Sequence, residues 1–250
     1  MKVFLIDANA LIYRIYHAMP YLVDPQGRPV QALYGLSNIL LRLLQEQKPD
    51  YIFALYDRPE PTIRHQVFKE YKATRPPITD DLKIQISLAK KIFSAFNIPV
   101  IEKIGYEADD LIASLKEKFS SLADEIIILT GDLDTLQLVD QKTKVLTMKK
   151  GITQTMIYDE KTIKEKYGLL PNQLPDYKAL IGDPSDNIIG ISGIGPKTAS
   201  QLLQKYQNLE GIIKAAHERK IEPKFREKIL VNKEKLLFNR DLVTLRKDIE

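Results

Sequence analysis

The sequence of 250 residues contains no cysteine and only three histidines. Without cysteine the chain can form no disulfide, no zinc-thiolate site and no thiol nucleophile. The histidines, His17, His65 and His217, lack the spacing of metal ligands, so we interpret them as structural or surface residues. The first apolar run ends at Asp7, which is too early for a signal peptide or a membrane span. We therefore expect a cytoplasmic protein with no membrane partner.

The sequence also has little excess of either charge. Lys and Arg together number 37 against 33 Asp and Glu, a formal net charge of +4. This excess permits a polyanionic partner without proving one, and it does so best if acids and bases gather in different places. The hydrophobic content of 44% is ordinary for a globular protein with a substantial core.

Three short apolar runs, at residues 3–6, 51–56 and 126–129, have the pattern of buried strands. Residues 8–19 and 32–47 carry apolar residues at helical spacing between the first two runs. Unbroken apolar strands that alternate with helices are typical of a parallel sheet covered on both faces. The sequence therefore predicts an α/β fold.

Each of these runs is followed by an acid: Asp7, Asp57, and then Asp132 with Asp134. In parallel sheets the ligand site lies beyond the carboxyl ends of the strands, so these acids should share one rim. Helix capping would explain any one of them, but it explains three strand ends together less well. A carboxylate cage without His or Cys suits Mg²⁺ or Mn²⁺.

A second group of acids, Glu107, Asp109 and Asp110, stands directly before the apolar residues 111–113. Three carboxylates in four positions repel one another and raise one another's pKa unless a cation neutralises them. Acids in a first helical turn also complement the helix dipole, which is the alternative for each one singly. Together with the strand-end acids they predict a divalent metal site.

Residues 58–91 form a basic segment between Asp57 and the Glu107 cluster. It contains Arg64, Lys69, Lys72 and Arg75, with Tyr71 among them. We expect helices at residues 62–72 and 80–96, separated by a proline break at residues 76–77. Such a run is often a solvated face, but an aromatic among cations also fits a groove for a single strand of nucleic acid.

The pattern changes after residue 129. Residues 144–148 and 152–157 alternate around Lys149-Lys150-Gly151, which predicts a hairpin, and everything from Asp159 onward has helical spacing. We therefore expect an α/β core at residues 1–158, with a basic arch at about 58–96, and a helical subdomain at 159–250. Within the subdomain, Gly193 and Gly195 precede Pro196-Lys197-Thr198-Ala199, and the amides at that helix start can bind a phosphate.

Six motifs in order resemble the 5′-nuclease superfamily, closest to the 5′→3′ exonuclease domain of bacterial DNA polymerase I and to stand-alone bacterial flap endonucleases. They are Asp7 in its strand, Arg64 through residues 71–75, residues 106–110, residues 130–134, residues 182–187 and residues 193–199. Ala8 stands where that family usually has glycine, and residues 58–61 read Arg-Pro-Glu-Pro where it usually has a glycine. Neither departure removes an acid.

The resemblance implies a mostly parallel sheet of the PIN type with flanking helices, a helical arch and a helix-three-turn-helix (helix-hairpin-helix) element. It also assigns residues. The metal ligands would be Asp7, Asp57, Glu107, Asp109, Asp110, Asp132, Asp134, Asp183 and Asp186, holding two or more ions. Lys72 and Arg75 would act on the scissile phosphate. Nucleic acid would be bound by Arg64, Tyr71, Lys72, Arg75, Gly193, Gly195, Lys197 and Thr198, and that family often holds a potassium ion at the hairpin.

The implied activity is Mg²⁺-dependent hydrolysis of DNA phosphodiesters by a structure-specific 5′-nuclease in replication and repair. Its partners would be DNA with 5′ flaps, nicks or single/double-strand junctions, RNA primers, and a DNA polymerase in cis or in trans. Two alternatives stay open: a PIN-type ribonuclease, against which residues 193–199 argue, and a branched-DNA-binding module that has lost its chemistry.

Overall fold

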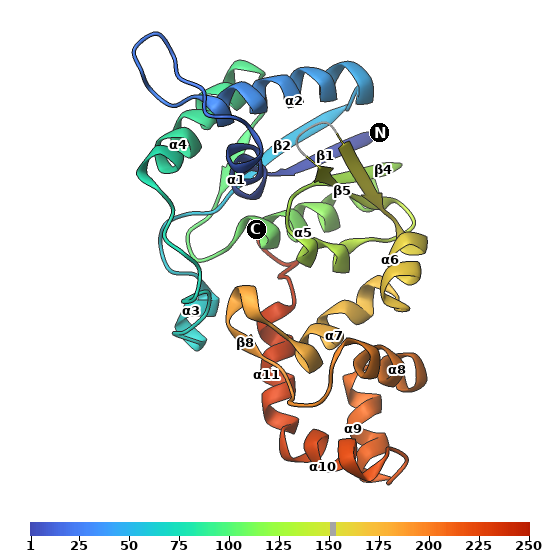
Figure 1. The fold of residues 1–250 in the computed structure, drawn as a ribbon. Helices are drawn as coiled ribbons and strands as arrows, with labels where there is room; N and C mark the ends of the chain where they lie inside the picture. The colour runs from blue at the N-terminus through green and yellow to red at the C-terminus, as the bar shows by residue number, and fades with distance from the viewer. Residues whose placement is uncertain (151–153) are drawn as a thin grey trace. The chain divides into compact units, whose positions relative to one another are not determined.

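The computed structural model describes residues 1–150 and 154–250, and the chain forms two compact units (Figure 1). The first unit consists of residues 1–62, 77–159 and 245–250. The second consists of residues 63–76 and 160–244. The chain thus leaves the first unit twice and returns to it twice.

The first unit is built on a six-stranded sheet with the order β3-β2-β1-β4-β5-β6. Neighbouring strands from β3 to β5 pair in parallel, and β6 pairs antiparallel with β5. The predicted mostly parallel sheet is confirmed. The strands are β1 (Lys2–Asp7), β2 (Tyr51–Tyr56), β3 (Val100–Glu102), β4 (Glu125–Leu129), β5 (Thr143–Lys150) and β6 (Gln154–Tyr158).

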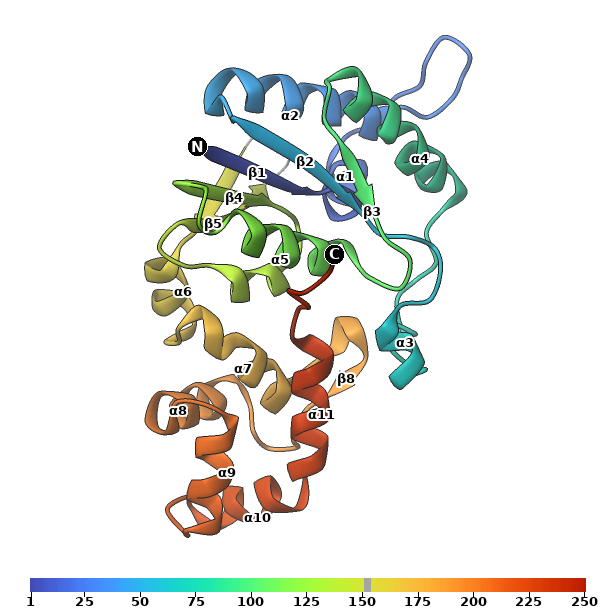
Figure 2. The ribbon, with the colours of Figure 1, turned by 180° about the vertical axis from the view of Figure 1, so that it is seen from behind.

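Helices cover both faces of this sheet (Figures 1 and 2). On one face α1 (Ala8–Ala18), α2 (Gln31–Gln47) and α4 (Asp80–Ala95) pack against one another and against Phe4 and Ile6 of β1. On the other face lies α5 (Ala108–Phe119), and the short 3₁₀ helix η1 (Leu133–Leu138) follows β4. Val3, Phe4, Leu5 and Ile6 are all fully buried, because each face of a central strand has a helical cover.

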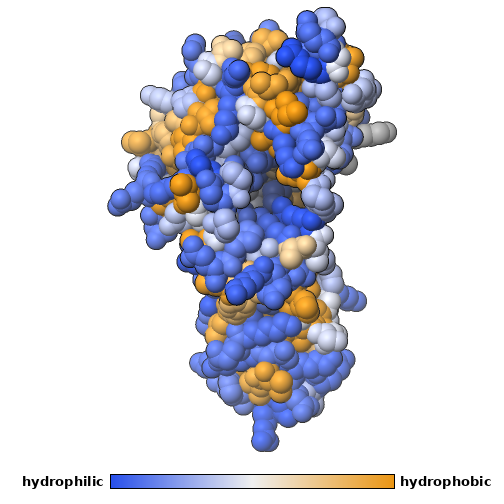
Figure 3. All heavy atoms as spheres, turned by 90° about the vertical axis from the view of Figure 1, so that its left-hand side faces the viewer, coloured by the Kyte–Doolittle hydropathy of each residue, from blue (hydrophilic) through white to orange (hydrophobic). Residues whose placement is uncertain are grey.

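The second unit is mostly helical, as the sequence predicted. It contains α3 (Ile63–Val67), α6 (Glu160–Tyr167), η2 (Pro171–Gln173), α7 (Leu174–Ile181), β7 (Gly182–Asp183), η3 (Pro184–Asp186), β8 (Ile188–Ile189), α8 (Pro196–Tyr206), α9 (Leu209–His217), α10 (Pro223–Val231) and α11 (Lys233–Val243). Its core is formed by buried aliphatic side chains of α7 to α11, among them Leu180, Leu203, Ile212, Ile229 and Leu236. Hydrophilic residues cover most of the face drawn in Figure 3, and the apolar ones form separate small groups.

Two expectations need correction, one strand had not been predicted, and one hairpin differs in its bounds. The helix predicted at residues 62–72 ends at Val67, because the chain then enters turns in which Lys72 takes a positive φ of 57°. The strand β3 has only three residues, too few to give a pattern of its own. The helical pattern from residue 159 onward is interrupted by the pair β7 and β8 and ends before the extended residues 245–250. The predicted hairpin is present, but β5 extends through Lys150, and its connection at 151–153 lies outside the described residues.

The last six residues belong to the first unit and pack beside α5. Leu245 donates its amide to Gln137 at 3.1 Å, and Ile249 donates to the Ser114 hydroxyl at 3.2 Å. This tail therefore fixes the same helix that carries the acidic first turn.

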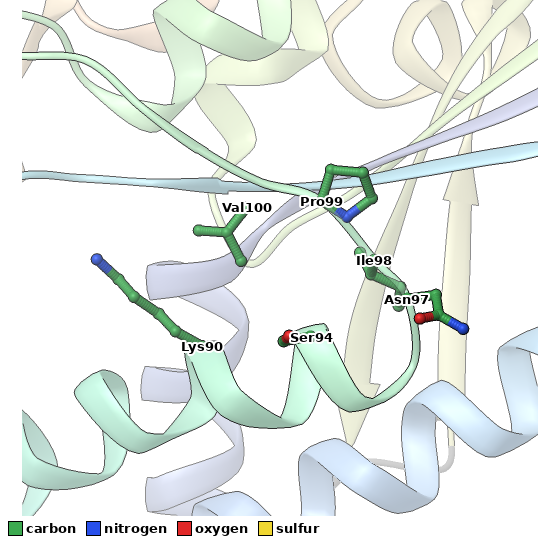
Figure 4. A pocket seen from close by; sticks show the side chains of 6 residues that line it. All are labelled: Lys90, Ser94, Asn97, Ile98, Pro99 and Val100. Atoms are coloured by element: carbon green, nitrogen blue, oxygen red, sulfur yellow. The ribbon is translucent and has the colours of Figure 1, made fainter.

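A hollow of about 490 Å³ lies between the C-terminal half of α4 and the start of β3 (Figure 4). Lys90 is the charged residue of its lining, and its ammonium group lies 2.5 Å from Glu102 and over the ring of Tyr56. The acids predicted from the sequence do not line this hollow. None of the helices in the described ranges 1–150 and 154–250 is both long enough and apolar enough to span a membrane.

Candidate metal centre

Seven of the nine predicted acids lie in the first unit, at or beside the carboxyl ends of adjacent strands. Asp7 is the last residue of β1, Asp57 follows β2, and Asp132 with Asp134 follows β4. Because β2, β1 and β4 are neighbours in the sheet, these acids approach one another. The remaining three, Glu107, Asp109 and Asp110, stand at the start of α5.

Asp7 is one of the buried acids of this group, with 5% of its surface exposed. One oxygen accepts from the Ala10 amide at 3.1 Å and so caps α1; the other accepts from the Thr130 hydroxyl at 2.8 Å. Burial, together with the negative charge of Asp57, raises the pKa of Asp7 to about 7. Asp132 acts in the same direction. A buried carboxylate among other carboxylates needs a cation to keep its charge near neutral pH.

Asp57 connects the end of β2 to the start of α5. Its Oδ1 accepts from the amide of Ala108 at 2.7 Å, the first residue of that helix. Its own amide donates to the Asn9 side chain at 3.3 Å. The carboxylate is thus held beside the acidic helix start, where the helix dipole also favours negative charge.

Glu107, Asp109 and Asp110 each offer a carboxylate oxygen, and these oxygens all lie within 4.8 Å of one another. Asp110 is completely buried, and its two oxygens accept the main-chain amides of Glu107, at 3.3 Å, and Arg246, at 2.9 Å. Asp110 therefore fixes the turn and the tail, while Glu107 and Asp109 present the cluster's other oxygens.

Thr130 organises the acids that follow β4. Its hydroxyl donates to Asp7 and accepts from the amide of Asp132 at 2.9 Å. Asp132 in turn caps η1 by accepting from the amide of Asp134 at 2.9 Å. Thr130 is 2% exposed, so its two hydrogen bonds are protected from solvent.

These groups fit a hard divalent cation. All the charged donors are carboxylates, the ligand type that Mg²⁺ and Mn²⁺ prefer. Burial, together with the negative charges of Asp57 and Asp132, raises the pKa of Asp7, and such a cation would favour its charged form. The hydrogen bonds from Thr130 and Ala108 orient two of the carboxylates, as hydrogen-bond donors beside metal ligands commonly do.

The other two predicted acids, Asp183 and Asp186, lie in the second unit around η3. Asp183 accepts from the Lys178 ammonium at 2.6 Å and from the amide and hydroxyl of Ser185 at 2.9 and 2.7 Å. Burial alone would raise the pKa of Asp183, but these partners outweigh it and the pKa is lowered. Asp183 is therefore held as a charged carboxylate.

The basic segment is not a uniformly solvated face. Arg64 is 4% exposed and donates to the carbonyls of Leu242 and Thr244, at 2.7 and 3.3 Å, at the end of α11. Tyr71 is 4% exposed, so in this arrangement its ring offers little surface on which a base could stack. Lys72 lies over that ring with its ammonium 5.0 Å from the centroid. Arg75 is paired with Asp186 at 2.6 Å.

The glycine turn at residues 193–195 lies between β8 and α8, on the connection that leads from α7 to α8, where the helix-hairpin-helix element was expected. Gly193 has a φ of +83°, a backbone conformation that residues with a side chain rarely adopt. Gly195 is the N-cap of α8, and a Cβ added there would meet open space. Gly195 and Lys197 are exposed and Thr198 is half-buried. The backbone at this helix start is therefore accessible to a phosphate.

Several residues that support the acids were not assigned a role from the sequence: Asn9, Thr130, Lys178, Ser185 and Arg246. Thr130 and Ser185 lie inside recognised motifs, so their position beside acids was a usable signal. Arg246 contributes a main-chain amide from 136 residues away, and no side-chain pattern reports such a contact.

Two family models match the chain and together cover nearly all of it. Residues 2–168 match the 5'-3' exonuclease N-terminal resolvase-like domain, and residues 169–250 match the 5'-3' exonuclease C-terminal SAM fold. DNA polymerase I of Caldicellulosiruptor bescii is 42% identical over 247 residues, which are 98% of this chain and 29% of that protein. The 5'-3' exonuclease of Aquifex aeolicus is 39% identical over 211 residues, 84% of this chain and 72% of that protein.

The fold also matches a solved structure. The bacteriophage T5 flap endonuclease, in a pseudo-enzyme-product complex with DNA and metal ions, superposes with a TM-score of 0.78 at 22% identity. The match covers 97% of this chain and 89% of that one. This chain spans less than a third of the C. bescii polymerase and most of the A. aeolicus exonuclease.

Proposed function

Because this chain belongs to the 5′–3′ exonuclease family, we propose that it is a structure-specific 5′-nuclease that hydrolyses DNA phosphodiesters with the help of divalent metal ions. The observation that carries the proposal is the carboxylate rim of the first unit, where Asp7 requires a cation to remain charged near neutral pH. Mg²⁺ is the cation we propose, with Mn²⁺ as a substitute.

Divalent cations bound by these acids would activate a water and stabilise the leaving oxygen of the phosphodiester. The protein's part is to orient the ligands. The Thr130 hydroxyl links Asp7 to the amide of Asp132, and the amide of Ala108 holds Asp57 at the start of α5. We propose that Glu107, Asp109, Asp110 and Asp134 complete this set and, following the resemblance, that Asp183 and Asp186 are further ligands.

We propose that Lys72 and Arg75 neutralise negative charge on the scissile phosphate. The hairpin with Gly193, Gly195, Lys197 and Thr198 would bind the duplex backbone, so recognition would depend on shape and phosphates more than on sequence. For Arg64 we propose a structural role behind this surface, since its guanidinium is buried on the end of α11.

The proposed substrates are DNA 5′ flaps, nicks and junctions of single and double strands, and also RNA primers. The products would be a 5′-phosphate and a 3′-hydroxyl. A DNA polymerase is the proposed partner, in the same chain or another, and the cytoplasm is the proposed location. The relatives named DNA polymerase I support this context.

The potassium ion implied by the resemblance has less support. The hairpin carbonyls of Ser192 and Gly190 accept from the ammonium groups of Lys228, at 2.8 Å, and Lys235, at 3.3 Å. These two oxygens already have cationic partners from the chain itself. We therefore propose no role for a potassium ion at them.

The test is cleavage of a 5′-labelled flap on a nicked duplex, in Mg²⁺ and separately in EDTA, with product lengths read on a gel. We expect Mg²⁺-dependent release of the flap at or one nucleotide inside the junction. Asp132→Asn should abolish cleavage, and Asp80→Asn, a matched change at an exposed acid of α4, should not. Tight DNA binding without cleavage would favour the binding module, and cleavage of single-stranded RNA alone would favour a PIN-type ribonuclease.

A further inference from the structure

The loop that carries Asp183 and Asp186 is fastened to the basic segment within the second unit. The amide of Lys72 donates to the carbonyl of Asp186 at 3.1 Å, and the Asn187 side chain donates to the carbonyl of Glu70 at 2.9 Å. Because these bonds use main-chain oxygens, they hold the two segments together whatever the state of the carboxylates.

The Asp186 carboxylate is itself held at both oxygens. The Tyr71 hydroxyl donates to Oδ2 at 2.9 Å, and Arg75 donates from Nη2 to Oδ1 at 2.6 Å. Asp186 is 5% exposed. Burying a carboxylate without hydrogen-bond partners would be strongly unfavourable, so the two residues compensate for its burial and hold it in one orientation.

The two partners differ in how freely they can move. Tyr71 is packed against Ile188, Leu242 and Val243, so its hydroxyl has a fixed position. The Arg75 side chain is 46% exposed and reaches Asp186 from the solvent side. Its Nε also donates to the Ser185 carbonyl at 3.1 Å, at an exposed position. Arg75 can therefore leave Asp186 by giving up solvent-accessible contacts, without disturbing the core, whereas Tyr71 cannot.

We infer that Tyr71 is a positioning residue that aims Asp186, and that Arg75 is an exchangeable counter-ion on Oδ1 until a divalent cation replaces it. The exchange keeps a positive charge beside the buried carboxylate at every stage. The released guanidinium can then bind a phosphate with its planar fork of donors. Cation binding at Asp186 and phosphate binding at Arg75 should therefore strengthen each other, since such coupling is reciprocal.

This inference rests on the proposed function, because it takes Asp186 as a ligand of a divalent cation. Two residues that the sequence assigned to nucleic-acid binding thereby take different roles. Tyr71 acts through Asp186 and not by stacking on a base, and Arg75 serves the acid first and the phosphate second.

The experiment measures Mn²⁺ binding to the whole metal-free protein, without DNA, by electron paramagnetic resonance of the free ion. Arg75→Gln should tighten Mn²⁺ binding on the order of tenfold, because the competing cation is gone. Tyr71→Phe keeps the packed ring but should weaken binding about tenfold, as loss of an orienting partner does. Arg42→Gln, which removes an arginine paired with Glu46 on α2, is the control and should change nothing.

Asp186→Asn supplies the second half of a double-mutant cycle. In that background both Arg75→Gln and Tyr71→Phe should lose their effect on Mn²⁺ affinity. Thermal unfolding of each variant shows whether it remains folded. If wild-type protein binds Mn²⁺ but Arg75→Gln leaves its affinity unchanged or weaker, the counter-ion role is wrong. If Tyr71→Phe leaves it unchanged, the positioning role is wrong. If the wild-type protein binds no Mn²⁺ at all, the proposed metal-dependent function itself fails and this inference fails with it.

Discussion

The hydroxyl of Thr130 lies between two acids that follow different strands, donating to Asp7 at 2.8 Å and accepting from the amide of Asp132 at 2.9 Å. A threonine hydroxyl has one proton to donate, and here it goes to the carboxylate. The amide of Asp132 donates a hydrogen bond to a lone pair of the same oxygen. This single buried group therefore links the end of β1 to the segment that follows β4.

Replacing this hydroxyl should slow catalysis without unfolding the protein. Thr130→Val keeps the shape of the side chain and removes both hydrogen bonds, so Asp7 loses its fixed orientation. We expect a fall in the single-turnover cleavage rate of about tenfold to a hundredfold, the usual effect of losing an orienting partner of a metal ligand. Thr130→Ser restores the hydroxyl and should recover most of the rate. A Thr130→Val enzyme as fast as wild type would remove this role.

The raised pKa of Asp7 makes the stability of the metal-free protein depend on pH. The folded state holds the proton up to about pH 7, whereas the unfolded chain releases it near pH 3.8. Between these values the native state binds more protons, so the free energy of unfolding falls as pH rises and then levels off above pH 7.

Asp7→Asn removes this titration and should stabilise the metal-free protein more at pH 8 than at pH 5. The titration range of Asp7 ends at about pH 7, so about two pH units of it lie between pH 5 and pH 8. At roughly 1.4 kcal/mol per unit this gives a difference of up to about 3 kcal/mol in the free energy of unfolding. Urea unfolding in EDTA at both pH values measures it. An advantage of Asp7→Asn that is the same at pH 5 and pH 8 would show that Asp7 does not titrate in this range.

The acids of the first unit were predictable because their signals are local. Asp7, Asp57 and Asp132 each follow a continuous apolar run, and parallel strands place such positions on one rim. The burial of Tyr71 and Arg64 was not predictable in this way. Both stand in a strongly basic stretch, and what buries them comes from Leu242 and its neighbours, more than 170 residues along the chain. Local composition describes the sequence around a residue, whereas burial depends on the distant segment that packs against it.

Arg64 offers a test of that distinction. Its guanidinium donates to the carbonyls of Leu242 and Thr244, so Arg64→Met leaves two buried acceptors without these donors. We expect a loss of about 2–4 kcal/mol in the free energy of unfolding, measured with urea. Lys69→Met, at an exposed lysine of the same segment, should leave stability within about 0.5 kcal/mol. If Arg64→Met instead lowered DNA affinity at unchanged stability, Arg64 would belong to the nucleic-acid surface.

The lysines beneath the hairpin predict how duplex binding responds to monovalent cations. Lys228 and Lys235 donate to the carbonyls of Ser192 and Gly190. Because these oxygens already contact ammonium groups of the chain, a free K⁺ ion is not needed there. At equal ionic strength, the duplex affinity of the wild-type protein should differ between K⁺ and Li⁺ by less than about twofold, against the steep fall with total salt that phosphate contacts cause. Lys228→Met exposes the Ser192 carbonyl and should create a preference for K⁺, while Lys233→Met on the neighbouring helix should not. Fluorescence anisotropy of a labelled duplex measures both effects. A saturable stimulation of the wild-type protein by K⁺ alone would mean that the hairpin binds the ion despite its lysines.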